Sequence, residues 1–165
     1  MIAGWVVVVS LLGCYSPPVA AQIAVPYVQP ACSYCPGHRG VEYAVAPGTD
    51  VRAVAPGVVA FSGTVAGTRY VVILQADGLR ATYGMLQSST LSRGDVVAAG
   101  QVTGRSGARV YFGLRNATDE PVDPSPLLGV LVGRVRLVPS NGGAPRRAPP
   151  PRLMCPAGVS GTLPV

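Results

Sequence analysis

Glycine interrupts this chain at short intervals between residues 37 and 128. Between the glycine-containing breaks lie short runs that are rich in valine, tyrosine and other strand-forming residues. Glycine is what tight turns with positive φ require, and β-branched and aromatic residues favour strands. No segment shows a convincing helical period. The spacing therefore predicts an all-β fold, an antiparallel sheet or sandwich, with strands at residues 51–54, 58–62, 70–74, 79–83, 96–98 and 109–114.

The charge balance gives limited information about partners. The 165 residues include 13 basic and 7 acidic side chains, a net charge of +6, and every basic residue is arginine. Arginine pairs bidentately with carboxylates and phosphates, so an anionic partner such as a cell-wall polymer or a lipid headgroup is one interpretation. The simpler interpretation is that the positive charge reflects a basic tail and a compositional bias. The arginines are dispersed and not interleaved with aromatic residues, which argues against nucleic-acid binding.

Residues 1–21 read as a signal peptide or a membrane anchor. The first fourteen are almost wholly apolar, and the run is too short to span a bilayer comfortably. Val19-Ala20-Ala21 predicts cleavage before Gln22, whereas Leu11-Leu12-Gly13-Cys14 suits a lipoprotein-type cleavage with acylated Cys14. An uncleaved anchor is the third interpretation. All three predict a secreted or envelope-located, extracytoplasmic protein, although no basic residue precedes Arg39.

The four cysteines are Cys14, Cys32, Cys35 and Cys155. In an exported chain they favour disulfides, and the natural pairings are Cys32 with Cys35, or one of these two with Cys155. The Cys-x-x-Cys spacing followed by His38 also suits a structural zinc site completed by Cys155. Because a second compact pair of ligands is missing, disulfides are the prediction.

Composition divides the rest of the chain into three parts. Residues 22–36 are uncharged and contain proline, which predicts an extended lead-in. Residues 37–138 form the β domain, with a last edge strand over 129–138. Residues 139–165 are rich in proline and arginine, and consecutive prolines cannot donate to a β ladder, so we expect a disordered tail.

Several motifs in the β domain occur in a recognisable order. His38-Arg39-Gly40-Val41-Glu42 is similar to a His-x-Gly-x-Asp zinc motif, residues 91–104 match a glycine-spaced hairpin, and residues 109–113 stand where a His-x-His-Phe-Glu strand is expected. In this order they resemble the lysostaphin/LytM-type zinc metallopeptidases. That resemblance implies the duplicated-hybrid-motif β fold and a relation to enzymes that cut peptide cross-links in bacterial peptidoglycan.

The resemblance also implies a site, with several of its side chains replaced. His38 falls on the first zinc ligand and Glu42 on the aspartate ligand, while Tyr111 replaces the remaining histidine ligand. Arg109 and Met85 replace the two catalytic histidines. A catalytic zinc takes three protein ligands, and a neutral phenol is a poor one. Neither guanidinium nor thioether can act as a general base, so the site predicts loss of catalysis.

The sequence therefore predicts a degenerate, non-catalytic peptidase-like domain without a cofactor. We expect it to bind peptidoglycan or its stem peptides through a groove containing Tyr83, Arg109 and Tyr111, or to regulate a cell-wall hydrolase. The alternative is an active zinc endopeptidase that uses His38, Glu42 and an unrecognised third donor, with zinc as its cofactor. A structural or lipoprotein module without a groove function is the third possibility.

Overall fold

The computed structural model describes residues 14–32, 34–133, 147 and 149–156. Its elements are β1 (Ile23–Val25), β2 (Val41–Ala44), β3 (Asp50–Arg52), β4 (Gly57–Val65), β5 (Thr68–Gln75), β6 (Arg80–Ser88), β7 (Val96–Val97), β8 (Val102–Arg115), β9 (Pro121–Val122), the 3₁₀ helix η1 (Ser125–Leu127), β10 (Val130–Val132) and β11 (Arg152–Met154).

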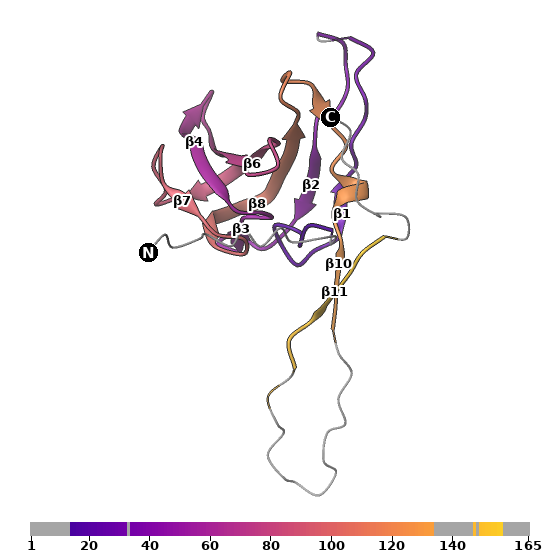
Figure 1. Cartoon of the computed structure of the whole chain (residues 1–165), viewed down its shortest axis with the longest axis vertical. Helices are drawn as coiled ribbons and strands as arrows, with labels where there is room; N and C mark the ends of the chain where they lie inside the picture. The colour runs from indigo at the N-terminus through magenta and orange to yellow at the C-terminus, as the bar shows by residue number, and fades with distance from the viewer. Residues whose placement is uncertain (1–13, 33, 134–146, 148, 157–165) are drawn as a thin grey trace, which may run out of the picture.

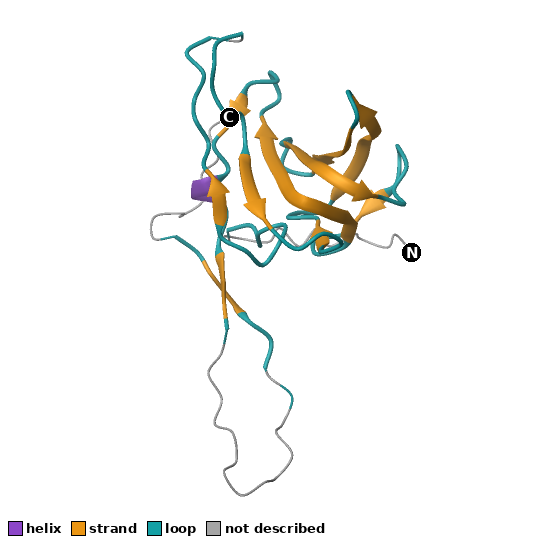
Figure 2. Ribbon diagram, turned by 180° about the vertical axis from the view of Figure 1, so that it is seen from behind, coloured by secondary structure: helices purple, strands orange, loops and turns teal. Residues whose placement is uncertain are grey.

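The strands form one large antiparallel sheet and a separate hairpin. The order in the large sheet is β1-β2-β8-β6-β5-β4-β7, and the long strand β8 also pairs with β3 and β9. The β10–β11 hairpin extends away from this sheet, as the two opposite views show (Figures 1 and 2). The predicted all-β, antiparallel fold is confirmed. Among the described residues, no helix has the length and apolar character needed to cross a membrane.

Most predicted strands are present, with shifted ends. The strand predicted at 51–54 is β3, those predicted at 58–62 and 79–83 extend into β4 and β6, and the run at 109–114 is only the second half of β8. The lead-in 22–36 contains a paired strand, β1, which the sequence did not predict. Of the edge strand predicted at 129–138, the structure has β10, and its remainder from residue 134 lies outside the described residues.

The core is built mainly from strands of the large sheet. Its largest fully buried side chains are Tyr43, Tyr83, Phe112, Ile73 and Leu114, surrounded by valines. Tyr83 and Phe112 lie opposite each other on β6 and β8, with ring centroids 5.3 Å apart. The Tyr83 hydroxyl accepts a hydrogen bond from the Val54 amide at 2.9 Å. Aromatic burial with a satisfied hydroxyl fixes these strands against each other.

One disulfide joins the two ends of the described chain, and a second is local. Cys32 pairs with Cys35, as predicted, but Cys155 pairs with Cys14 rather than with either of these. The prediction left Cys14 unpaired because it placed that residue in a removed or acylated leader. In the predicted tail, Arg152–Met154 forms a strand with β10, so this part is paired, not disordered; residues 139–146, 148 and 157–165 lie outside the described residues.

Candidate functional site

The pairing of β2 with β8 brings the predicted site residues together. Glu42 lies directly opposite Tyr111, and Ala44 lies opposite Arg109. Side chains at alternate positions share one face of a strand, so Tyr111 and Arg109 project on the same side of β8 as Glu42 does from β2. His38 precedes β2 and is positioned by two backbone hydrogen bonds with Val28, each 2.9 Å.

Glu42 is the centre of an ionic cluster. One carboxylate oxygen, Oε1, lies 3.2 Å from His38 Nε2, and the other, Oε2, lies 2.9 Å from the Arg109 guanidinium. The Glu42 side chain is 12% exposed, whereas that of Arg109 is 56% exposed. The other His38 nitrogen, Nδ1, contacts the Pro26 carbonyl oxygen at 2.9 Å. Both oxygens of Glu42 and both nitrogens of His38 therefore already have polar partners.

Tyr111 contacts His38 through its ring and directs its hydroxyl elsewhere. The two rings meet edge to face, with centroids 5.9 Å apart and planes at 88°. The phenol donates to the Arg39 carbonyl oxygen at 3.0 Å. Gly40 leaves room for the Tyr111 ring. A Cβ at residue 40 would lie 2.7 Å from that ring and 2.5 Å from the Phe112 carbonyl oxygen. Burial raises the pKa of the Tyr111 phenol, which keeps it protonated at neutral pH.

The two remaining predicted residues, Tyr83 and Met85, both belong to β6. Tyr83 is fully buried in the core, so the prediction that it lines a binding groove is wrong. On a strand the faces alternate, and Tyr83 belongs to the inner one. Met85 lies on β6 at a β-bulge, with φ of 59°. A thioether carries no proton that it could transfer, so Met85 cannot act as a general acid or base.

Sequence reasoning missed Tyr70. This residue lies on β5, and its ring covers Gly84 of β6, where a Cβ would lie only 2.5 Å from it. Gly84 is the register partner of Tyr111, so Tyr70 and Tyr111 lie on neighbouring parts of the same face. The contact joins residues on three strands. The only signal in the sequence was the glycine at position 84, which makes room for a ring.

The donor set does not fit a catalytic zinc ion. His38 and Glu42 are two candidate ligands, but the Tyr111 oxygen is a protonated donor turned towards Arg39, and the guanidinium of Arg109 occupies the free oxygen of Glu42. A cation at this position would have to displace an existing positive charge. Within the described ranges, no group of three His, Cys, Asp or Glu side chains is placed to hold a metal ion. The arrangement suits recognition of a carboxylate or amide by Arg109 better than Lewis-acid chemistry.

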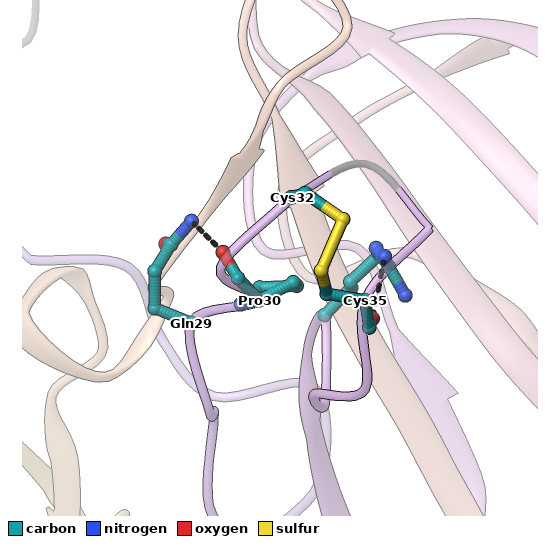
Figure 3. Close-up of a disulfide and its surroundings, with 5 residues drawn as sticks. Gln29, Pro30, Cys32 and Cys35 are labelled. Atoms are coloured by element: carbon teal, nitrogen blue, oxygen red, sulfur yellow. Dashed lines mark hydrogen bonds between the residues drawn. A yellow bond between two sulfur atoms is a disulfide. The ribbon is translucent and has the colours of Figure 1, made fainter.

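The Cys32–Cys35 disulfide closes a short loop that precedes His38 in the chain (Figure 3). The Arg39 guanidinium donates to the Cys35 carbonyl oxygen at 3.3 Å, and Gln29 donates to the Pro30 carbonyl oxygen at the base of the same loop. Because both sulfurs are bonded to each other, and Cys155 is bonded to Cys14, the alternative zinc site of Cys32, Cys35, His38 and Cys155 is wrong. The loop is therefore closed by a covalent bond.

A cavity of about 460 Å³ lies on the other side of β2. Tyr43 lines it, and Tyr43 follows Glu42 on the strand, so it projects to the opposite face. The remaining walls come from residues 17–23, from residues 125–131 and from Pro156. The cavity is therefore separate from the His38, Glu42 and Arg109 cluster.

Comparisons with known proteins agree with the fold. Residues 36–124, more than half of the chain, match the model of peptidase family M23. A DD-carboxypeptidase/endopeptidase Mpg of Neisseria meningitidis is 36% identical over 95 residues, which is 53% of this chain and 22% of that protein. The chain thus spans about a fifth of the curated relatives it matches.

Solved structures show the same similarity. Csd3 of Helicobacter pylori has a TM-score of 0.61 at 28% identity, over 70% of this chain and 33% of that one. The catalytic domain of the prophage-encoded M23 protein EnpA from Enterococcus faecalis has a TM-score of 0.56 at 29% identity, over 68% and 97%. A chain in the SpoIIQ–SpoIIIAH pore-forming complex shares the fold alone, with a TM-score of 0.61 at 19% identity over 70% of this chain and 90% of that one.

Proposed function

The chain belongs to peptidase family M23, and we propose that it is a non-catalytic member that binds peptidoglycan stem peptides in the cell envelope. The observation that carries this proposal is the Arg109–Glu42–His38 cluster, in which a guanidinium bonds the carboxylate that would otherwise face a metal ion. A guanidinium is a cation with donors in a fixed planar arrangement, so on this carboxylate it takes the place that a metal ion would need.

The exposure of Arg109 supports binding of a peptide. Its side chain is more than half exposed, while the Glu42 carboxylate that orients it is mostly buried. A guanidinium has several donors, so one can stay on Glu42 while others reach a ligand. Stem peptides of peptidoglycan present carboxylates and amides, and Arg109 with the neighbouring Tyr70 and Tyr111 offers charged and aromatic contacts for both.

The name of a similar protein is consistent with this proposal. The similar Neisseria protein is a DD-carboxypeptidase/endopeptidase by name. Binding to peptidoglycan by this chain places it where a separate cell-wall hydrolase acts. It then localises or regulates that hydrolase instead of cutting cross-links itself.

Co-sedimentation with purified, insoluble peptidoglycan sacculi tests the binding. We expect wild-type protein to co-sediment at moderate salt, and the Arg109→Ala variant to lose most of that binding. Arg93→Ala is the matched control, because it removes the same charge from an exposed turn between β6 and β7. Equal loss in both variants, or no co-sedimentation of wild type, contradicts the proposal.

A metal and activity assay separates this function from the zinc-peptidase alternative. Purified protein is assayed for zinc content and for release of muropeptides from the same sacculi. The proposal predicts neither bound zinc nor cleavage. About one zinc per chain, lost together with cleavage on chelation and in a His38→Ala variant, would establish the enzyme instead.

A further inference from the structure

Residues 14–21, which the sequence reads as part of a leader, are built into the folded domain. Val19 is 3% exposed and belongs to the main hydrophobic core. The Pro18 carbonyl accepts a 2.8 Å hydrogen bond from the Arg52 amide of β3. Buried apolar side chains and paired backbone groups are what a domain element has and a removed leader lacks.

Tyr15 attaches the same segment at two further places. Its amide donates to the Leu127 carbonyl at 2.7 Å, and its carbonyl accepts from the Gly129 amide at 2.9 Å, a bridge that runs parallel to residues 127–129. Its hydroxyl donates to the Asp77 carboxylate in the turn between β5 and β6. The segment therefore crosses from the C-terminal part of the domain to the large sheet.

Cys14 is held in an enclosed position that fits a disulfide. It is 8% exposed, and its sulfur is bonded to that of Cys155 with the two Cα atoms 5.3 Å apart. The Cys14 sulfur lies where a side chain at position 129 would begin, because a Cβ on Gly129 would be 2.4 Å from it. The glycine is thus required for the cystine to lie here.

We propose that Cys14 is a half-cystine of the mature protein, so that Tyr15–Ala21 is retained and Cys14 carries no lipid. Cleavage after Ala21 would remove Tyr15 and Val19 and leave Cys155 without its partner. Acylation would use the same sulfur. The bond forms when the Cys14 and Cys155 thiols reduce a disulfide oxidant: one S–S bond forms in the chain, and the oxidant leaves as two thiols.

Peptide mapping tests this proposal, on protein that has been expressed with its natural N-terminal sequence and exported. The first basic residue is Arg39 and the last is Arg152, so trypsin gives an N-terminal peptide ending at Arg39 and a C-terminal peptide of residues 153–165. Without reduction, we expect one species that contains both peptides. With reduction, it separates into the two, and the first begins at or before Cys14.

Three results would overturn the proposal. They are an N-terminal peptide that begins at Gln22, an acyl mass on Cys14, and a C-terminal peptide that is free or linked only to Cys32 or Cys35 before reduction.

A Cys14→Ser variant supplies an independent test. It is expected to release the C-terminal peptide without reduction and to lower the thermal midpoint. The matched Cys32→Ser variant is expected to keep the link between the two peptides, and its loss there would also contradict the proposal.

Discussion

At the scale of single residues, two side chains on β8, Arg109 and Tyr111, carry the proposed loss of metal chemistry. His38 and Glu42 remain within 3.2 Å of each other, which is a distance compatible with sharing a ligand. On β8, Arg109 supplies a charge to Glu42 and Tyr111 supplies a phenol that bonds Arg39.

This predicts that zinc binding can be restored. In a variant with Arg109→His and Tyr111→His, an imidazole stands opposite Glu42 and the competing guanidinium is gone. We expect about one tightly bound zinc ion per chain, because three neutral or anionic ligands then meet. Metal analysis after dialysis measures it. Arg109→His alone should bind none, and absence of zinc in the double variant would mean that the backbone here no longer suits a metal.

Buried phenols predict a loss of stability at alkaline pH. Burial raises the pKa of Tyr43 and of Tyr83 well above the ordinary value of 10.0. Above that value the unfolded chain loses phenol protons that the folded chain keeps, so the free energy of unfolding falls as pH rises through the interval between the two pKa values. Each such group contributes a slope of up to about 1.4 kcal/mol per pH unit.

Denaturant unfolding from pH 8 to pH 12 measures this loss, with the absorbance of ionised tyrosine as a second probe. The Tyr43→Phe variant should show a shallower fall. Tyr34→Phe is the control, since Tyr34 is fully exposed. A slope that is the same in wild type and in Tyr43→Phe would contradict the assignment.

The sequence predicted which residues gather at the site better than it predicted what they do there. His38, Glu42, Tyr111 and Arg109 were placed by their position in motifs, and the pairing of β2 with β8 brings them together. The error at Tyr83 has a physical cause. Successive side chains on a strand point to opposite faces of the sheet, but the sequence does not show which of the two faces is buried. A bulge between Gly84 and Leu86 changes the alternation again.

At the scale of elements, the β4–β5 hairpin holds an unfavourable residue in its turn. The two turn residues, Ala66 and Gly67, have φ of 48° and 80°. A two-residue turn with positive φ at both positions suits Asn-Gly, whereas alanine pays a steric cost from its Cβ. The hairpin forms because its strands pair over their full length, despite this cost.

Ala66→Asn should therefore stabilise the protein. We expect a gain of about 1 kcal/mol, or a rise of the thermal midpoint by roughly 2–4 °C. Thermal unfolding followed by circular dichroism measures it. Ala66→Val is the matched control and should lower the midpoint, because a β-branched side chain is worse at positive φ. A lower midpoint for Ala66→Asn would show that the turn is not strained.

Glycine breaks allowed prediction of most strands of the large sheet, but not of β1 or of β11 in the separate hairpin. β1 and β11 contain three residues each, and prolines lie close to both, so neither shows a period. Their strand character comes from pairing with β2 and β10. A local sequence pattern contains no information about pairing partners that are distant in the sequence.

At the scale of the whole molecule, the two disulfides differ greatly in the length of chain they close. Cys14 and Cys155 are 141 residues apart, and Cys32 and Cys35 are three apart. In the chain-entropy account, a longer loop removes more freedom from the unfolded chain. The first disulfide should therefore contribute most of the stabilisation.

Replacing both cysteines of each pair by alanine tests this difference. We expect the Cys14→Ala, Cys155→Ala variant to lose about 5 kcal/mol and the Cys32→Ala, Cys35→Ala variant to lose about 2 kcal/mol. Urea unfolding of the two variants and wild type gives the comparison, and each variant serves as the control for the other. A larger loss in the Cys32→Ala, Cys35→Ala variant would mean that local loop structure, and not chain entropy, dominates.

The bond between Cys14 and Cys155 also determines how the domain carries mechanical load. Their Cα atoms are only 5.3 Å apart although almost the whole described chain lies between them. Tension applied to the polypeptide on either side of this pair passes directly across the sulfur–sulfur bond. The sheet and the ionic cluster lie off that path, so pulling on both ends strains a covalent link and leaves the folded body unloaded.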